Sequence, residues 1–277
     1  MPMTIQRDGV GDVSIRQSFS CPLVYLDHWA VRRFSDDALI ADRFIAALHA
    51  AQGTWLFSQM NLTEFTAMRD IPTARRVEAL IQRAFPYFYV LDTVDDTPYF
   101  RADRAERPRP PDAPEKHWML KDLCDRAVIA GGTFNANRFF SDGIDHADEL
   151  LPIFEQMKRD ISNHITAIRE AVFAETNRRD LVPGRHMRLI DIFKEELLVE
   201  PVGQANQRFQ ENDAVDFVHA LPACQLCDMV LLDTAWCHKV ALATQRIRDA
   251  GIEGKIAACY SPNGVGDFLA ALEAVRK

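Results

Sequence analysis

The sequence predicts an α/β protein, a three-layer α/β/α sandwich in which helices cover both faces of a central, mainly parallel sheet. Five short apolar runs have the length of buried strands, and segments with apolar residues at helical spacing lie between them. This alternation is typical of parallel sheets, since each crossover must carry the chain back to the edge where the strand began. The 277 residues are 48% hydrophobic, which is enough to build one large core.

The first half of the chain carries three of the five predicted strands. Leu39, Phe44 and Leu48 follow helical spacing after the first strand, and Gly53 ends that pattern. The expected elements are, in order, a strand at 23–27, a helix capped by Ser35 or Asp36, a strand at 54–58, a helix from Asn61, a helix at 73–84 and a strand at 87–91.

The middle of the chain departs from this alternation. Residues 95–115 contain five of the fourteen prolines and four arginines, which predicts an exposed loop. Helices are expected at 147–178 and 186–199. The first of them carries an apolar stripe formed by Phe154, Met157, Ile161, Ile165, Ile168 and Val172. We therefore interpret residues 95–209 as a mainly helical insertion in an α/β core formed by 20–94 and 210–277.

The α/β alternation resumes in the last quarter of the chain. The expected elements are a helix that Asp213 opens, a strand at 229–233, a helix at 234–249, a strand at 255–260 and a helix at 265–275. These two strands complete a sheet of five.

Composition limits the possible functions. The net charge of −8 excludes a protein that coats nucleic acid through a broad basic face, but not an enzyme that meets phosphates through bound metal ions. No apolar run has the roughly 20 residues of a membrane helix. The first twenty residues lack the apolar core of a secretion signal, so we expect a cytoplasmic protein. Six scattered cysteines in a chain of this length favour reduced thiols.

Two of the predicted strands end in an aspartate that is not expected to cap a helix. They are Asp27, after Leu-Val-Tyr-Leu, and Asp233, after Met-Val-Leu-Leu. If the two strands are neighbours in a parallel sheet, their carboxylates meet at the crevice where such sheets bind ligands. Carboxylates held close together repel unless a proton or a cation lies between them, and we expect a divalent cation.

Further acids lie at predicted element ends, where each also has a structural interpretation. Glu64 suits a capping box, Asp213 suits the cap of the helix that it opens, and Asp216 suits the first turn of that helix. Asp213 and Asp216 are alternatives for one role in a metal site. Asp228 precedes the fourth strand.

In combination, these segments resemble the acidic pattern of PIN-domain nucleases. Asp27 after an apolar strand, Ser58 six residues before Glu64 in FSQMNLTEF, Asp216 at the start of DFVHA and Asp233 at the end of MVLLD occur in the order of that family's motifs. The resemblance implies a PIN-like sheet of order 3-2-1-4-5, in which the first and fourth strands are neighbours. Asp27 and Asp233 then meet where the strand order reverses.

The resemblance also implies a function, the hydrolysis of RNA phosphodiester bonds by an endoribonuclease that depends on Mg²⁺ or Mn²⁺. The expected catalytic and metal-binding residues are Asp27, Glu64, Asp216 and Asp233, with Asp213 as the alternative third acid. The expected supporting residues are Ser58, His28, His219 and Asp228. Apart from the resemblance, Arg101 and Arg104 lie near Tyr99 and Phe100 in the proline-rich loop, a mixture of cations and aromatics that suits contact with RNA, whereas the acids within this loop suit a solvated loop instead. The expected partners are RNA, a second copy of the chain and an inhibitory protein, with no membrane.

The same motifs bear on other functions. A catalytically silent PIN-like module that binds RNA or protein stays an alternative. The spacing of Cys224 and Cys227, with His219, Cys237 and His238 nearby, allows a zinc site. A phosphatase of the haloacid dehalogenase type is disfavoured because Trp29 occupies the place of its second aspartate. The Gly264-Val265-Gly266 fragment lacks the third glycine of a dinucleotide site.

Overall fold

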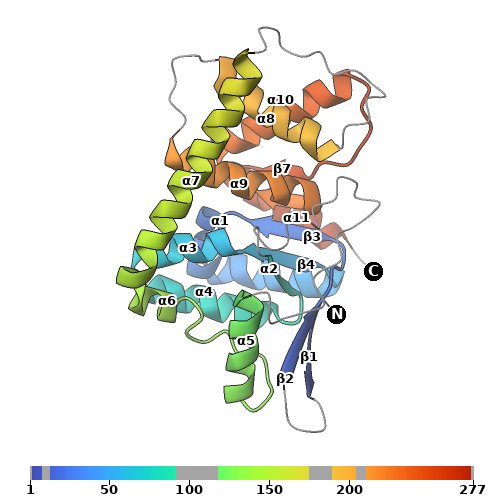
Figure 1. The fold of residues 1–277 in the computed structure, drawn as a ribbon. Helices are drawn as coiled ribbons and strands as arrows, with labels where there is room; N and C mark the ends of the chain where they lie inside the picture. Colours follow the sequence, from blue (N-terminus) through green and yellow to red (C-terminus); the bar gives the residue numbers. More distant parts are fainter. Residues whose placement is uncertain (1, 8–12, 92–117, 175–188, 204–209, 276–277) are drawn as a thin grey trace.

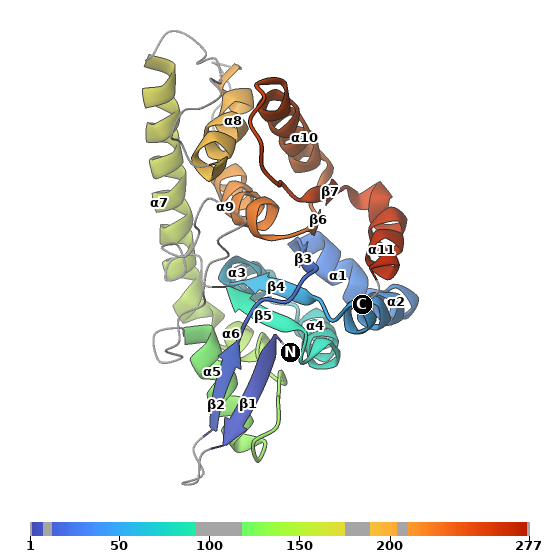
Figure 2. The ribbon, with the colours of Figure 1, turned by 90° about the vertical axis from the view of Figure 1, so that its right-hand side faces the viewer.

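The central feature of the fold is a five-stranded parallel sheet. The computed structural model describes residues 2–7, 13–91, 118–174, 189–203 and 210–275. The strands lie in the order β5-β4-β3-β6-β7 (Figure 1, Figure 2). They are β3 (Leu23–Leu26), β4 (Thr54–Ser58), β5 (Phe88–Leu91), β6 (Met229–Leu231) and β7 (Ala258–Tyr260). The predicted α/β class with a five-stranded parallel sheet is confirmed.

Side chains that alternate along the strands face two separate hydrophobic cores. Val24 and Trp55 face the layer formed by α1 (His28–Asp36), α2 (Ala38–Ala51), α4 (Ile71–Ala84) and α11 (Val265–Ala274). Tyr25 and Leu56 face the layer formed by α9 (Glu211–Leu226) and α10 (Thr234–Asp249). Both faces of the sheet are therefore covered, which is why its strands are continuous apolar runs rather than alternating ones.

The helices between residues 118 and 203 pack on both of these cores. α5 (Trp118–Ile129) contributes Leu123 and the segment before α6 (Ser141–Asp145) contributes Phe140 to the first core. α7 (Ala147–Ala174) contributes Ile165 and α8 (Leu189–Gly203) contributes Phe193 to the second. In Figure 1 the long α7 crosses the molecule from α6 to α8 and packs along α9. Among the described helices, none combines the length and apolar content that crossing a bilayer requires.

Among the described side chains of the apolar stripe predicted on α7, only Ile165 is fully buried. Ile165 is 3% exposed, whereas Phe154, Met157 and Ile161 are half-buried. The side chains of Ile168 and Val172 lie outside the described part. The stripe therefore lies against the molecule near Ile165 and is partly open to solvent nearer the start of the helix.

Several local elements differ from the sequence-based expectation. An antiparallel hairpin of β1 (Met3–Arg7) and β2 (Val13–Gln17) forms where only a polar start was expected. α1 begins directly after Asp27, where no helix was predicted. α2 is capped by Asp37, whose carboxylate accepts hydrogen bonds from the next helical N–H groups, and not by Ser35 or Asp36. The proline-rich loop at 95–115 lies outside the described residues.

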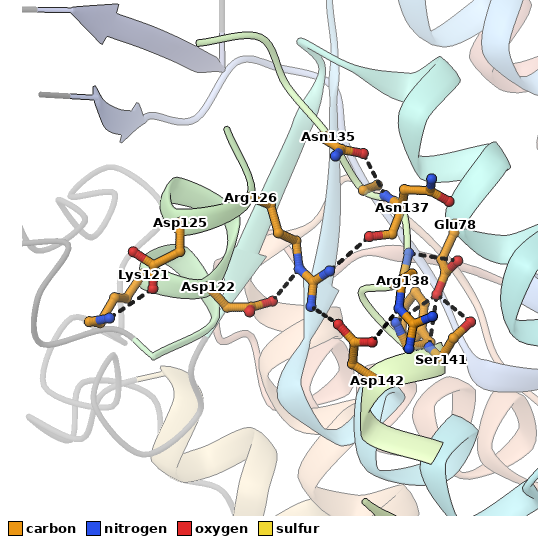
Figure 3. A network of polar contacts seen from close by, with 12 residues as sticks. Glu78, Lys121, Asp122, Asp125, Arg126, Asn135, Asn137, Arg138, Ser141 and Asp142 are labelled. Carbon is orange, nitrogen blue, oxygen red and sulfur yellow. Dashed lines mark hydrogen bonds and ion pairs between the residues drawn. The ribbon is translucent and has the colours of Figure 1, made fainter. Parts of the chain in front are cut away.

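A buried glutamate fastens the segment before α6 to α4. Glu78 of α4 is 3% exposed. Its carboxylate accepts hydrogen bonds of 2.8–3.0 Å from the backbone N–H groups of Arg138, Phe140 and Ser141 and from the Ser141 hydroxyl (Figure 3). Hydrogen bonds to an ionised acceptor are stronger than neutral ones. Glu78 therefore fixes the segment that carries Phe140 into the first core.

Candidate acidic site

Asp27 and Asp233 lie near each other at the carboxyl edge of the sheet. Each follows one of the neighbouring strands β3 and β6, and the backbone N–H of Asp27 donates to the carbonyl of Leu231 at 3.0 Å. Both also cap helices, which corrects the expectation that neither does. Oδ1 of Asp27 accepts from the N–H of His28 at the start of α1, and Oδ1 of Asp233 accepts from the N–H of Trp236 in α10, both at 2.8 Å. The caps fix the orientation of the two carboxylates.

Glu64 does not have the capping role that the sequence allowed. Its helix, α3 (Gln59–Met68), begins two residues earlier than predicted, with Ser58 as N-cap and Asn61 as the third residue that closes the capping box. Glu64 instead faces two histidines. Its carboxylate lies 3.7 Å from Nδ1 of His28 and 3.4 Å from Nε2 of His219. Burial by itself raises the pKa of Glu64, but the contacts and positive charges of His219 and His28 outweigh it and lower the pKa to about 2.

The structure separates the two alternatives for the third acid. Asp213 is the third residue of α9, and its Oδ2 accepts from the N–H of Gln210 at 3.1 Å in a capping box. Asp216 lies one turn further along and turns towards the other acids. Burial raises the pKa of Asp216 to about 7, and the negative charges of Asp27, Asp233 and Glu64 add to the effect. Asp216 therefore belongs to the acidic cluster and Asp213 is a helix cap.

The carboxylates of this cluster act on one another electrostatically. Burial raises the pKa of Asp27 to about 6, with smaller contributions from the charges of Glu64 and Asp233, although His219 and the hydrogen bond from His28 oppose the rise. All four acids are half-buried. We define the acidic cluster as Asp27, Glu64, Asp216 and Asp233.

A chain of buried, hydrogen-bonded polar side chains lies beneath the acidic cluster. The Tyr25 hydroxyl is hydrogen-bonded to Nδ1 of His219, and Ser58 lies 3.5 Å from the same nitrogen. Ser58 in turn donates to Oδ1 of Asn61 at 3.1 Å. Burial lowers the pKa of His219, but the contact with Glu64 and the surrounding negative charges raise it overall. Of the predicted supporting residues, His219 thus contacts Glu64 of the acidic cluster, and Ser58 contacts His219 from inside the protein.

Tyr25 and Asn61 are the two members of this group of hydrogen-bonded side chains that sequence reasoning missed. Tyr25 is 1% exposed and Asn61 is fully buried. A tyrosine inside an apolar strand was a usable signal, because a buried hydroxyl needs a hydrogen-bond partner. Asn61 gives no such signal, because its position in the sequence indicates only the start of a helix.

Other predicted site residues lie elsewhere. Asp228 precedes β6 at the amino edge of the sheet, where its carboxylate accepts from the N–H of Leu23 and from Nζ of Lys255, both at 2.7 Å. It therefore holds the starts of two strands and does not meet the acidic cluster. Arg101 and Arg104 lie outside the described residues.

The acidic cluster has the charge and the oxygen ligands that suit a hard divalent cation. Glu64 Oε2 is buried and accepts no hydrogen bond from the described residues, although Nε2 of His219 lies 3.4 Å from it. The negative charges of the other acids contribute to the raised pKa values of Asp27 and Asp216. A bound cation would relieve this repulsion. The described chain holds no group of three or more His, Cys, Asp or Glu side chains already arranged around a metal position.

The cysteines that suggested zinc are not assembled with a third ligand in the described residues. Cys224 and Cys227 are buried at the end of α9. His219, on the same helix, contacts Tyr25 and Glu64 instead.

Comparison of the chain with protein-family models, curated proteins and solved structures found no match.

Proposed function

We propose that this chain is a PIN-like, metal-dependent ribonuclease that hydrolyses internal phosphodiester bonds. The observation that supports the proposal is the meeting of four carboxylates from four separate segments at the carboxyl edge of β3 and β6. Asp27 and Asp233 follow these strands, and Glu64 and Asp216 come from α3 and α9. This edge, where the strand order reverses, is where parallel sheets bind ligands. The PIN-like class and the RNA substrate come from the resemblance of the motifs.

Each acid of the cluster has a distinct part in holding Mg²⁺ or Mn²⁺. Asp27 and Asp233 accept their helix-cap hydrogen bonds through Oδ1, so Oδ2 of each would be available to hold a cation. Glu64 is kept ionised by His28 and His219. Asp216 completes the oxygen ligand set. When bound, such ions activate water and stabilise the charge that develops on a phosphate group during in-line displacement.

The protonation of Asp27 and Asp216 should make metal binding depend on pH. Their pKa values are raised to about 6 and about 7, so the two carboxyl groups of the metal-free site are partly protonated at neutral pH. A divalent cation competes with that proton, because it neutralises the same repulsion. Metal binding should therefore release protons and tighten as the pH rises through 6 to 7.

The test compares variants that preserve the fold. Wild type, Asp233→Asn, Asp216→Asn and Asp213→Asn are incubated with a mixed RNA pool in Mg²⁺, Mn²⁺ or EDTA, and the products are separated on a gel. Asparagine caps a helix about as well as aspartate, so Asp233→Asn keeps α10 intact. Asp213→Asn is the matched control, since it changes a carboxylate on α9 outside the cluster.

The proposal expects cleavage by wild type and Asp213→Asn, no cleavage in EDTA, and a loss of at least about a hundredfold in the two cluster variants. Equal cleavage by all four proteins would show contamination and remove the cluster from the reaction. No cleavage by any of them, together with no effect of Mn²⁺ on thermal unfolding, would favour the silent binding module.

A further inference from the structure

Two half-buried cysteines meet next to the acidic cluster, although 22 residues separate them in the chain. Cys237 lies in the first turn of α10, four residues after Asp233, and Cys259 is the middle residue of the edge strand β7. Their Sγ atoms are 2.8 Å apart. Because an S–S bond is about 2.05 Å long, the two sulfur atoms need to approach by only about 0.8 Å to bond.

The surroundings keep these two side chains in place. Cys237 Sγ contacts the carbonyl of Leu232 at 3.6 Å. The backbone N–H of Cys237 donates to the backbone carbonyl of Asp233 in the first turn of α10. Cys259 lies opposite Val230 in the parallel register of β6 and β7. Both sulfurs are fixed by regular structure, so their approach does not depend on a loop.

We propose that Cys237 and Cys259 are a redox modification site, which forms a reversible disulfide when the protein meets a hydroperoxide. In the first step the Cys237 thiolate attacks the peroxide oxygen, an S–O bond forms, the O–O bond breaks, and an alcohol or water leaves. In the second step the Cys259 sulfur attacks the oxidised sulfur of Cys237, the S–S bond forms, the S–O bond breaks, and the hydroxyl leaves as water with the Cys259 proton. The two sulfurs together lose two electrons, and the peroxide gains them. A dithiol reductant reverses the reaction by thiol–disulfide exchange.

The electrostatics of the pair agree with this order of attack. The hydrogen bond between the two thiols lowers the pKa of Cys237, and the same hydrogen bond and burial raise the pKa of Cys259. Cys237 is therefore the more readily ionised sulfur, and the thiolate is the form that attacks peroxide.

The disulfide would fasten the start of α10 to β7. It would close a loop that runs from Cys237 through the rest of α10 and the segment before β7 to Cys259. Such a cross-link restricts the conformations of the unfolded chain. Oxidation should therefore raise the midpoint temperature of unfolding by a few degrees, and reduction should reverse the rise. The disulfide is independent of nuclease activity, because it involves neither metal nor RNA.

The experiment uses the purified full chain. Reduced protein is treated with hydrogen peroxide, denatured, alkylated and digested with trypsin, which cuts between the two cysteines at Lys239, Arg246, Arg248 and Lys255. Mass spectrometry should find a cross-linked pair of peptides that carry Cys237 and Cys259. Four of the six cysteines should be alkylated after oxidation, and all six should be alkylated when dithiothreitol is added before the alkylating reagent.

Matched variants distinguish this bond from general oxidation. Cys237→Ser and Cys259→Ser should lose both the cross-linked peptide and the rise in unfolding temperature. Cys21→Ser, which removes another half-buried thiol, should keep both. Sulfinic or sulfonic acid on Cys237 with Cys259 still reduced would overturn the proposal. So would a bond that appears only between two chains on a non-reducing gel.

Discussion

Replacing Asp216 by asparagine should stabilise the metal-free protein at neutral and alkaline pH. In the folded protein the pKa of Asp216 is raised from 3.8 to about 7, first by burial and then by the charges of Asp27, Asp233 and Glu64. Such a rise corresponds to about 4 kcal/mol of unfavourable free energy when the carboxylate is ionised in both states. Asp216 keeps part of its surface in solvent, so we expect a gain of about 1–2 kcal/mol in the free energy of unfolding.

The stabilisation by Asp216→Asn should increase with pH. Because the folded pKa lies above the ordinary value, the folded protein binds the Asp216 proton more tightly than the unfolded chain does. Wild-type stability is therefore lost as the pH rises from about 4 to about 7. The gain from Asp216→Asn should be near its maximum at pH 8 and should disappear near pH 4, where the aspartate is protonated in the folded state.

The assay is urea unfolding in EDTA at pH 4, 6 and 8, followed by circular dichroism. Asp213→Asn is the control on the same helix, and we expect it to change stability by less than about 0.5 kcal/mol at every pH. A gain of equal size at pH 4 and pH 8 would show that charge repulsion is not its cause. The absence of any gain at pH 8 would refute the placement of Asp216 among the other acids.

The same three proteins also test whether the acidic cluster binds a divalent metal ion. A cation that binds only the folded protein stabilises it by about 2.7 kcal/mol at a concentration 100 times its Kd. Mn²⁺ should therefore raise the unfolding temperature of wild type and Asp213→Asn more than that of Asp216→Asn. An equal rise in all three proteins would place the Mn²⁺ elsewhere.

Three further predictions follow from the described contacts. Glu78→Gln should lower the free energy of unfolding by about 1–3 kcal/mol in urea, because the amide of glutamine would face a backbone N–H that the carboxylate now accepts from. His219→Gln should destabilise the protein by about 1–3 kcal/mol at pH 6 and by less at pH 9. The raised pKa of His219 means that its favourable pairing with Glu64 is present at low pH and is lost as the pH rises; an equal loss at both values would contradict this pairing. Asp228→Ala should cost about 1–2 kcal/mol in urea unfolding yet leave RNA cleavage unchanged, since its carboxylate holds the N–H of Leu23 at the opposite edge of the sheet.

Much of the sheet could be predicted from the sequence, because a strand buried on both faces is a short apolar run with distinct ends. The strand over 54–58 was predicted with the bounds that β4 has, and β3 and β5 differ from their predictions by one residue. The helix over 234–249 also has the bounds of α10. These elements depend on the properties of residues near one another in the chain.

Other elements were missed where the local pattern was weak. α1 contains only three fully buried residues, Ala30, Val31 and Phe34, between polar and charged ones. Its cap, Asp27, directly follows an apolar strand, and that position indicates a site residue more strongly than a helix cap. The hairpin of β1 and β2 is likewise short, and its burial depends on contact with later segments such as α5.

The sequence determined which residue types are available for the candidate site, whereas the tertiary structure decided which of them meet. The apolar runs place Asp27 and Asp233 at strand ends, and the resemblance to PIN-domain nucleases implies that these two strands are neighbours. The choice of Asp216 over Asp213, the contact of Glu64 with two histidines, and the approach of Cys237 to Cys259 all required coordinates. Charges and thiols act through space over a few ångströms, and their distances depend on how whole elements pack, which no local pattern along the chain records.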